Sequence, residues 1–220
     1  THLSEEYLNL VRELGISLKA AKLPRLKLDR EALPKALAAV GLEALNLKRS
    51  KVIGICPGAA YGPAKRWPED KFIETARILK DIYCAKILVF GDKKEKRVCE
   101  RIARVIGNSA VSMAGKTNLL ETMALIKECD VLICNDSGLM HAATALGVPV
   151  IAIFGSTEPA WTSPLGKGNT VIYKDVHCSP CFKRVCVNAA RDYYYLATIS
   201  VVDVVGAAKK ILKGRYNECD

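Results

Sequence analysis

The stretch NDSGLMHAATALGVPVIAIFG, residues 135–155, decides the fold of this chain. It follows a short apolar run over 130–134 and contains polar turn residues, a helical pattern over 138–146 and a second apolar run over 149–154. A strand, a helix and a strand in this order predict a parallel βαβ unit. Because the helix begins where the first strand ends, its free N–H groups and positive dipole end should face a crevice that favours anions.

The polar residues of this stretch admit two interpretations. Asp136 and Ser137 either only cap the helix of an ordinary βαβ unit or take part in binding. His141 lies in the first turns of the helix, close enough to donate to a phosphate or a ribose. A histidine beside apolar residues is also often a satisfied core group, so the local sequence leaves both interpretations open.

The same alternation of strands and helices continues along most of the chain. Further strands are predicted over 51–56, 86–90, 109–113 and 170–173, and further helices over 69–82, 94–106, 118–128 and 200–213. We therefore predict an α/β fold, a Rossmann-like parallel sheet with helices on both faces, over residues 51–220. Residues 1–50 are predicted to form an amphipathic helix over 3–14 and then an interdomain connector over 21–50, broken by prolines.

A second loop with binding character follows the strand over 51–56. PGAAYGPAKRWP, residues 57–68, contains Gly58 and Gly62, which let a backbone approach a ligand closely, and then a Lys-Arg pair. It matches neither the P-loop nor the dinucleotide fingerprint. We interpret it as a phosphate-contacting loop of another kind, and the alternative is a solvated basic loop.

Composition narrows the classes of function. The chain has 220 residues, of which 50% are hydrophobic, and a net charge of +10. Its Lys and Arg residues are scattered and no helix-turn-helix, RNP or zinc-finger spacing accompanies them, so we predict no nucleic-acid partner. Without a long apolar run or a signal peptide, and with Thr1 in place of Met, the sequence is interpreted as a cytoplasmic product that lacks its natural start.

The chain contains nine cysteines, a number that without a secretory signal indicates a reducing compartment. Three of them, Cys178, Cys181 and Cys186, lie in HCSPCFKRVC, residues 177–186, with a spacing that some zinc sites use. His177 directly adjoins a cysteine and reaches the same metal poorly, so a fourth ligand is badly placed. We predict no metal site here, only a reduced loop.

Three separated blocks resemble, in the same order, the signature blocks of the ADP-heptose:lipopolysaccharide heptosyltransferases, glycosyltransferase family 9. They are PGAAYGPAKRWP at 57–68, NDSGLMHAATALGVPVIAIFGSTEPAWTSPLG at 135–166, and HCSPCFKRVC at 177–186. The resemblance covers about residues 50–215, and the KRWP form is most similar to the heptosyltransferase II branch. It implies the GT-B architecture of two Rossmann-like domains, of which this chain resembles only the C-terminal, donor-binding one.

The resemblance also implies an activity and its partners. The whole enzyme would transfer L-glycero-D-manno-heptose from an ADP-heptose donor, with inversion, to the heptosyl-Kdo inner core of lipopolysaccharide. The general base and the acceptor groove would belong to an N-terminal GT-B domain that has no counterpart here, so the chain alone is expected to be inactive. The basic charge suits peripheral contact with the anionic cytoplasmic face of the inner membrane. No D-x-D motif indicates an obligatory metal, and no cofactor is expected.

Individual residues receive roles by the same resemblance. Lys65 matches the lysine that contacts the diphosphate and would stabilise the departing ADP. Because a carboxylate repels phosphate, we assign Asp136 to sugar hydroxyls or to capping of backbone N–H groups. Met123 matches an apolar position against the adenine, with core packing as the alternative. The predicted substrate-binding residues are Ala60, Tyr61, Lys65, Glu95, Met123, Asp136, Ser137, Gly138, Leu139 and His141.

Three of these assignments depend on weaker correspondences. Ala60 and Tyr61 occupy loop positions where relatives carry hydroxyl side chains, and Glu95 is a candidate for the ribose hydroxyls or a solvated residue. Other functions also remain open at this point. Another GT-B sugar transferase or a nucleotide-sugar epimerase would use the same diphosphate site, and a non-catalytic nucleotide-sugar-binding module would need no second domain.

Overall fold

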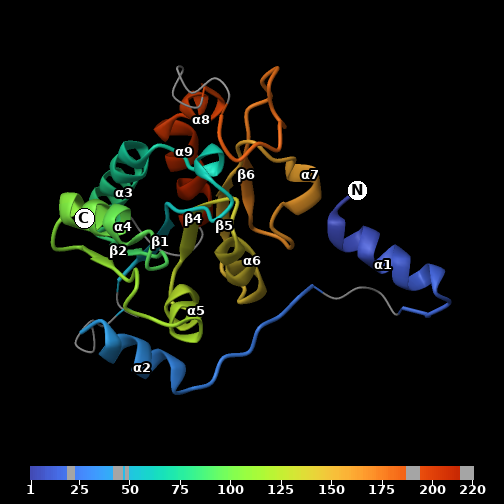
Figure 1. Ribbon diagram of the computed structural model, residues 1–220. Helices are drawn as coiled ribbons and strands as arrows, with labels where there is room; N and C mark the ends of the chain where they lie inside the picture. Colours follow the sequence, from blue (N-terminus) through green and yellow to red (C-terminus); the bar gives the residue numbers. More distant parts are fainter. Residues whose placement is uncertain (19–22, 42–46, 48–49, 187–193, 214–220) are drawn as a thin grey trace.

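A fully parallel six-stranded sheet forms the centre of the computed structural model, which describes residues 1–18, 23–41, 47, 50–186 and 194–213. The order along the sheet is β3-β2-β1-β4-β5-β6 (Figure 1). The strands are β1 (Val52–Cys56), β2 (Lys86–Val89), β3 (Ala110–Ser112), β4 (Val131–Asn135), β5 (Val150–Ile153) and β6 (Thr170–Ile172). The predicted α/β class with a parallel sheet is confirmed. The chain reverses its direction of progress between β1 and β4, and in such sheets ligands bind at the carboxyl ends beside this point.

Helices cover both faces of the sheet and enclose two separate apolar layers (Figure 1). On one face lie α3 (Glu69–Tyr83), α4 (Lys96–Ile106) and α9 (Val201–Leu212); on the other lie α2 (Ala32–Ala39), α5 (Leu119–Lys127) and α6 (Gly138–Ala145). Successive residues of β1 alternate between the layers: Ile53 and Ile55 pack with the first set, Val52 and Cys56 with the second. Burial on both faces explains why the strands are continuous apolar runs.

Every predicted strand and helix is present, with ends displaced by one or two residues. Among the elements of the described residues, four short ones were not predicted: α2, the 3-10 turn η2 (Pro63–Lys65), α7 (Pro159–Thr162) and α8 (Tyr194–Thr198). The helix α2 was missed because the prolines within residues 21–50 were interpreted as breaks in a connector. Pro34 stands in the first turn of α2, where its missing N–H needs no helical partner. Ala36 of this helix is fully buried in the sheet's second apolar layer.

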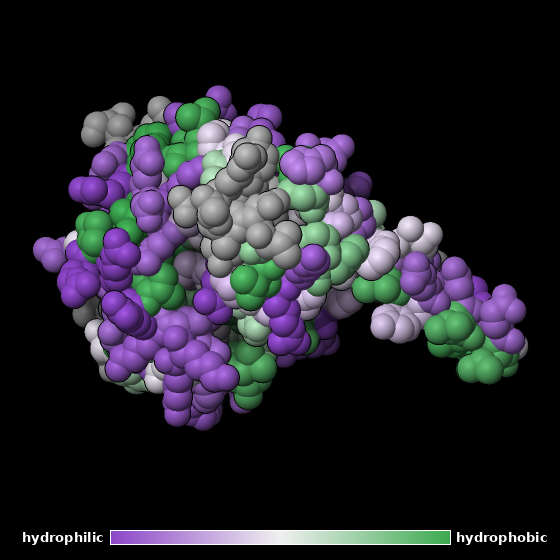
Figure 2. Space-filling model, turned by 45° about the horizontal axis from the view of Figure 1, so that its top comes forward, coloured by the Kyte–Doolittle hydropathy of each residue, from purple (hydrophilic) through white to green (hydrophobic). Residues whose placement is uncertain are grey.

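The first helix, α1 (Leu3–Glu13), extends away from the sheet (Figure 1). His2 anchors its start, since Nε2 lies 3.1 Å from the carbonyl oxygen of Ser163. Apolar residues gather at the outer end of this arm (Figure 2), where Leu10 and Leu14 are 62% and 79% exposed. No helix within the described ranges is long and apolar enough to span a bilayer.

Candidate functional site

A cavity of about 670 Å³ lies at the carboxyl edge of the sheet, among the loops that follow β1, β2, β4 and β5. All ten residues predicted to bind substrate line it: Ala60, Tyr61, Lys65, Glu95, Met123, Asp136, Ser137, Gly138, Leu139 and His141. The structure thus brings together side chains spread over about 80 residues of sequence. Their individual contacts with a donor remain predictions. Lining residues that the sequence analysis missed include Phe90, Leu119, Thr157, Trp161 and Phe182.

An ion pair lines the cavity. Lys65 Nζ, from η2, donates to Oδ2 of Asp136, which directly follows β4. Thr157 Oγ1, from the loop after β5, donates to the same oxygen at 2.7 Å. The Lys65 and Asp136 side chains are only 12% and 6% exposed, so water screens the pair weakly. A single carboxylate oxygen therefore joins three loops of the site.

This arrangement corrects the proposed capping roles of Asp136 and Ser137. Ser137 occupies the N-cap position of α6 with an extended backbone, but no side-chain hydrogen bond caps the helix. Its Oγ is buried and has no hydrogen-bond partner among the described residues. The helix begins at Gly138, which lines the cavity, so the first-turn amides and the positive dipole end lie beside the Lys65 ammonium. Two sources of positive potential converge, as an anion site requires.

Asn135 holds the two central loops together, a role that the sequence analysis missed. This fully buried last residue of β4 accepts a hydrogen bond from the Trp67 amide at 3.0 Å. Its Nδ2 donates to the Pro57 carbonyl at 2.8 Å. β1 and β4 are neighbours in the sheet, so this side chain fixes the distance between the Lys65 loop and the start of α6. A buried amide at a strand end was the available signal.

The glycines of the loop over 57–68 make room for the protein's own groups. A Cβ on Gly58 would lie 1.7 Å from Oε1 of Glu95. Gly62 has φ +153°, and a Cβ there would lie 2.5 Å from the carbonyl oxygen of Arg184. Each glycine thus leaves room for one of the protein's own groups, and Gly58 also lines the cavity. Gly58 lets Glu95, whose Oε2 accepts from the Asp92 amide at 3.0 Å, line the same cavity.

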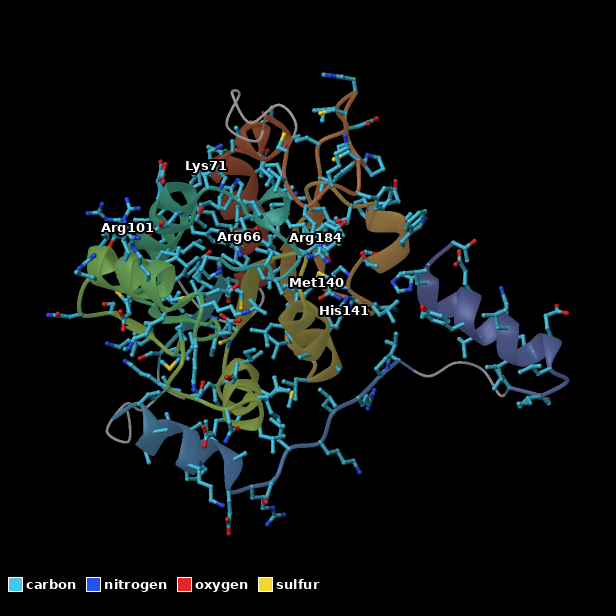
Figure 3. The ribbon with its side chains drawn as sticks, in the orientation of Figure 1. Arg66, Lys71, Arg101, Met140, His141 and Arg184 are labelled. Carbon is cyan, nitrogen blue, oxygen red and sulfur yellow. The ribbon has the colours of Figure 1, made fainter. Side chains whose placement is uncertain are left out.

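The segment over residues 178–186, which contains three cysteines, packs against the same loop. The Arg184 carbonyl accepts from the Ala64 amide at 3.1 Å, and the Tyr61 hydroxyl donates to the Phe182 carbonyl at 2.5 Å. The Tyr61 ring lies 4.7 Å from Lys65 Nζ and 5.2 Å from the Arg184 guanidinium carbon. The contact with the Tyr61 ring orients the Lys65 side chain. Arg184 and His141, from distant parts of the sequence, both lie at this edge of the sheet (Figure 3).

The two ends of the cavity differ in chemistry. Glu95, Leu119 and Met123 line it from the β2 and α5 side. Met123 is half-buried and is not part of the apolar layer formed by its neighbours Leu125 and Ile126, so packing into the core does not account for it. Such an apolar end with one carboxylate suits a nucleoside.

His141 and two buried thiols, those of Cys99 and Cys134, are neutral near pH 7. Partial desolvation lowers the pKa of His141; the nearby Asp136 carboxylate opposes this, and the positive charge of Lys65 adds to the lowering. Burial raises the pKa of Cys134, which precedes Asn135, and raises that of Cys99 to about 12. These thiols therefore stay protonated, whereas a neutral imidazole can donate one hydrogen bond to a ligand.

The 178–186 segment contains no metal cluster within the part of the chain that the structure describes. No group of three or more His, Cys, Asp or Glu residues converges there. Cys186 is buried, while Cys178 and Cys181 are partly exposed, all as free thiols. The prediction that this loop binds no zinc remains to be tested with protein.

Comparison with known proteins gives the same family as the sequence blocks. The family model of glycosyltransferase family 9 (heptosyltransferase) matches residues 1–191. Lipooligosaccharide heptosyltransferase 2 of Haemophilus influenzae is 36% identical over 176 residues, which are 76% of this chain and 51% of that protein. The chain thus spans about half the length of this curated relative.

Solved structures show the same similarity in three dimensions. ADP-heptose LPS heptosyltransferase II of E. coli superposes with a TM-score of 0.74 at 28% identity, over 90% of this chain and 56% of that one. A family 9 glycosyl transferase from Veillonella parvula superposes with a TM-score of 0.83 at 25% identity, over 97% and 60% of the two chains. This chain therefore matches a little over half of each of these two structures.

Proposed function

Because this chain belongs to glycosyltransferase family 9, the heptosyltransferases, we propose that it forms the donor-binding half of an enzyme that transfers L-glycero-D-manno-heptose. The donor would be ADP-heptose, and the acceptor would be the heptosyl-Kdo inner core of lipopolysaccharide. One observation carries the proposal: Lys65, the N-terminus of α6 and an apolar nucleoside end line a single cavity at the switch point of the sheet.

The diphosphate belongs at the centre of this cavity. Lys65 Nζ supplies a positive charge, and the first turn of α6 supplies amide donors. As the glycosidic bond breaks, negative charge grows on the departing ADP. An ammonium held over the Tyr61 ring stabilises that charge with little reorganisation. The adenine would then lie against Met123 and the ribose hydroxyls near Glu95.

The acceptor side belongs to a second domain. Inversion requires a general base on the face of the sugar opposite the ADP, and the GT-B layout places that carboxylate on the N-terminal domain. The chain alone should therefore bind nucleotide weakly and transfer nothing, because its cavity is open to water and no acceptor hydroxyl is held in line.

A basic strip along α4 supports contact with an anionic membrane surface. Its side chains surround a shallow hollow of about 510 Å³, and Arg101 lies on α4 facing away from the sheet (Figure 3). Arg101 pairs with Glu69 at 3.1 Å, and Lys96 with Glu100 at 3.7 Å, so the strip keeps an excess of positive charge. The cations are Lys93, Lys94, Lys96, Arg97, Arg101 and Arg104. Each adds about 1 kcal/mol near an anionic leaflet.

Calorimetric titration of the chain with ADP, ADP-heptose and UDP-sugars tests the proposal. We expect weak binding of both adenine nucleotides and weaker binding of UDP-sugars. Lys65→Ala should weaken ADP binding, while Lys127→Ala, the same charge change at an exposed residue of α5 outside the cavity, should not. A preference for UDP donors would contradict the adenine assignment. Heptose transfer by the isolated chain would overturn the assignment of the general base to another domain.

A further inference from the structure

Two aromatic rings stack against each other at the rim of the cavity. Trp161 lies on α7 and Phe182 in the 178–186 segment, with ring centroids 4.9 Å apart and planes at 22°. Both line the cavity, yet they remain 43% and 40% exposed. Trp67 is the contrasting case, because its ring is 2% exposed and packs edge-on against Phe72 inside the core. The Trp161–Phe182 pair therefore keeps apolar surface open toward the site.

The backbone of Phe182 is held in an unusual conformation. Its φ is +55°, a region that bulky L residues rarely adopt. The peptide groups on both sides of the residue are fixed: its N–H donates to the Ser156 carbonyl at 2.7 Å, and its carbonyl accepts the Tyr61 hydroxyl. Conformations of this kind persist where the surroundings enforce them and cluster at ligand sites. The fold thus places the ring of Phe182 where it meets Trp161.

The strand order places the pair at one particular end of the cavity. The β2 and α5 side, with Glu95 and Met123, lies beyond β1, and the diphosphate position at Lys65 lies beside β4. Trp161 follows β5, on the opposite side, and α6 lies between α5 and α7 in Figure 1. A nucleotide that runs from the α5 side across Lys65 therefore directs whatever its second phosphate carries toward α7.

We propose that the Trp161–Phe182 pair is the platform for the sugar ring of the nucleotide-sugar donor; this assignment rests on the proposed function. A pyranose has an apolar C–H face and a rim of hydroxyls, so a rigid aromatic surface with polar neighbours fits it. Thr157 and Glu158, on the same loop, supply the polar groups for the rim. The rings contribute contact area at low entropy cost, because Phe182 is already fixed and Trp161 is stacked on it.

Titration with two ligands, ADP and ADP-heptose, separates the sugar platform from the nucleotide site. Trp161→Ala should lower the affinity for ADP-heptose by about three- to tenfold, the value of one aromatic stacking contact. It should leave the affinity for ADP unchanged, which also shows that the variant is folded. Trp161→Phe should restore most of the loss. Leu119→Ala, at the nucleoside end of the cavity, should lower the affinities for ADP and ADP-heptose by the same factor. Val202→Ala, at an exposed residue of α9, should change neither affinity.

Tryptophan fluorescence gives a second readout, because the chain has only two tryptophans and Trp67 is buried. ADP-heptose should change the emission of Trp161, and ADP should change it much less. If Trp161→Ala lowered the affinities for ADP and ADP-heptose equally, or lowered neither, the assignment of the sugar platform would be overturned. The proposed nucleotide site would still stand. A wild-type chain that bound neither ADP nor ADP-heptose would instead contradict the proposed function and remove the platform with it.

Discussion

Replacing Asp136 by Asn should change stability and nucleotide affinity in opposite directions. In the empty site the Lys65 ammonium is neutralised by Asp136 and both side chains are largely buried. The amide of Asn keeps an acceptor for Lys65 and for the Thr157 hydroxyl but removes the charge. A hydrogen bond to a charged group contributes about 1.5–3 kcal/mol. We therefore expect the free energy of unfolding to fall by about 2 kcal/mol, which lowers Tm by about 4–8 °C in a chain of this size.

The same substitution should strengthen ADP binding. Two unit charges 4 Å apart interact with about 4 kcal/mol at an effective dielectric constant of about 20. The Asp136 carboxylate competes with the diphosphate for the Lys65 ammonium. It also repels the diphosphate, over a slightly longer distance than that between the diphosphate and Lys65. After allowance for water in the open cavity, about 1.4 kcal/mol remains, which is about a tenfold gain in ADP affinity. The affinity for ADP-heptose should rise less than that for ADP, because Asp136 is also the predicted acceptor for the hydroxyls of the sugar.

Thermal unfolding with and without ADP, together with calorimetry, measures both effects. Asp175→Asn is the matched control, because it makes the same charge change at an exposed residue outside the cavity. It should shift neither quantity measurably. A fall in ADP affinity in Asp136→Asn would refute the reasoning, since it would mean that the carboxylate positions Lys65 for the phosphate instead of competing with it.

The remaining predictions concern catalysis, stability, thiol reactivity and metal. Lys65→Ala in the intact two-domain enzyme should lower kcat/KM on the order of 100-fold, and steady-state rates within about twofold of wild type would contradict the leaving-group role. Ser200→Ala removes the capping box of α9 and should cost about 1 kcal/mol in denaturant unfolding. The hydrogen bond from the Ser200 amide lowers the pKa of Asp203 below 3.8, so its contribution is present above that pH and is lost as the pH falls through the folded-state pKa; a loss on raising the pH would be inconsistent with this. Because burial raises its pKa, Cys134 should resist iodoacetamide at pH 8 until the protein unfolds, as mass spectrometry can show. Protein purified without added metal should contain no stoichiometric zinc in the 178–186 segment, and unfolding on chelation would show the opposite.

The sequence by itself determined the local elements and the composition of the site. Residues 130–154 predicted a strand, a helix and a strand because apolar periodicity and turn chemistry act over a few neighbouring positions. Lys65 was identified because its basic loop follows a strand and matches a signature block of the family, and Gly138 because a helix begins there directly after a strand. Prolines gave the opposite result in the range 21–50, since a proline in the first turn of a helix is compatible with it, and α2 was missed.

Only the tertiary structure decided which of these residues meet. Lys65 and Asp136 are 71 residues apart and pair because β1 and β4 are neighbours, a pairing that no local pattern specifies. The hydrogen bonds between Asn135 and the loop after β1 depend on the same pairing of β1 with β4. The stacking of Trp161 on Phe182 requires the 178–186 segment to fold back over the loop after β1. Periodicity reports which face of an element is buried, whereas contacts between distant loops depend on strand order and on hydrogen bonds formed only in the assembled fold.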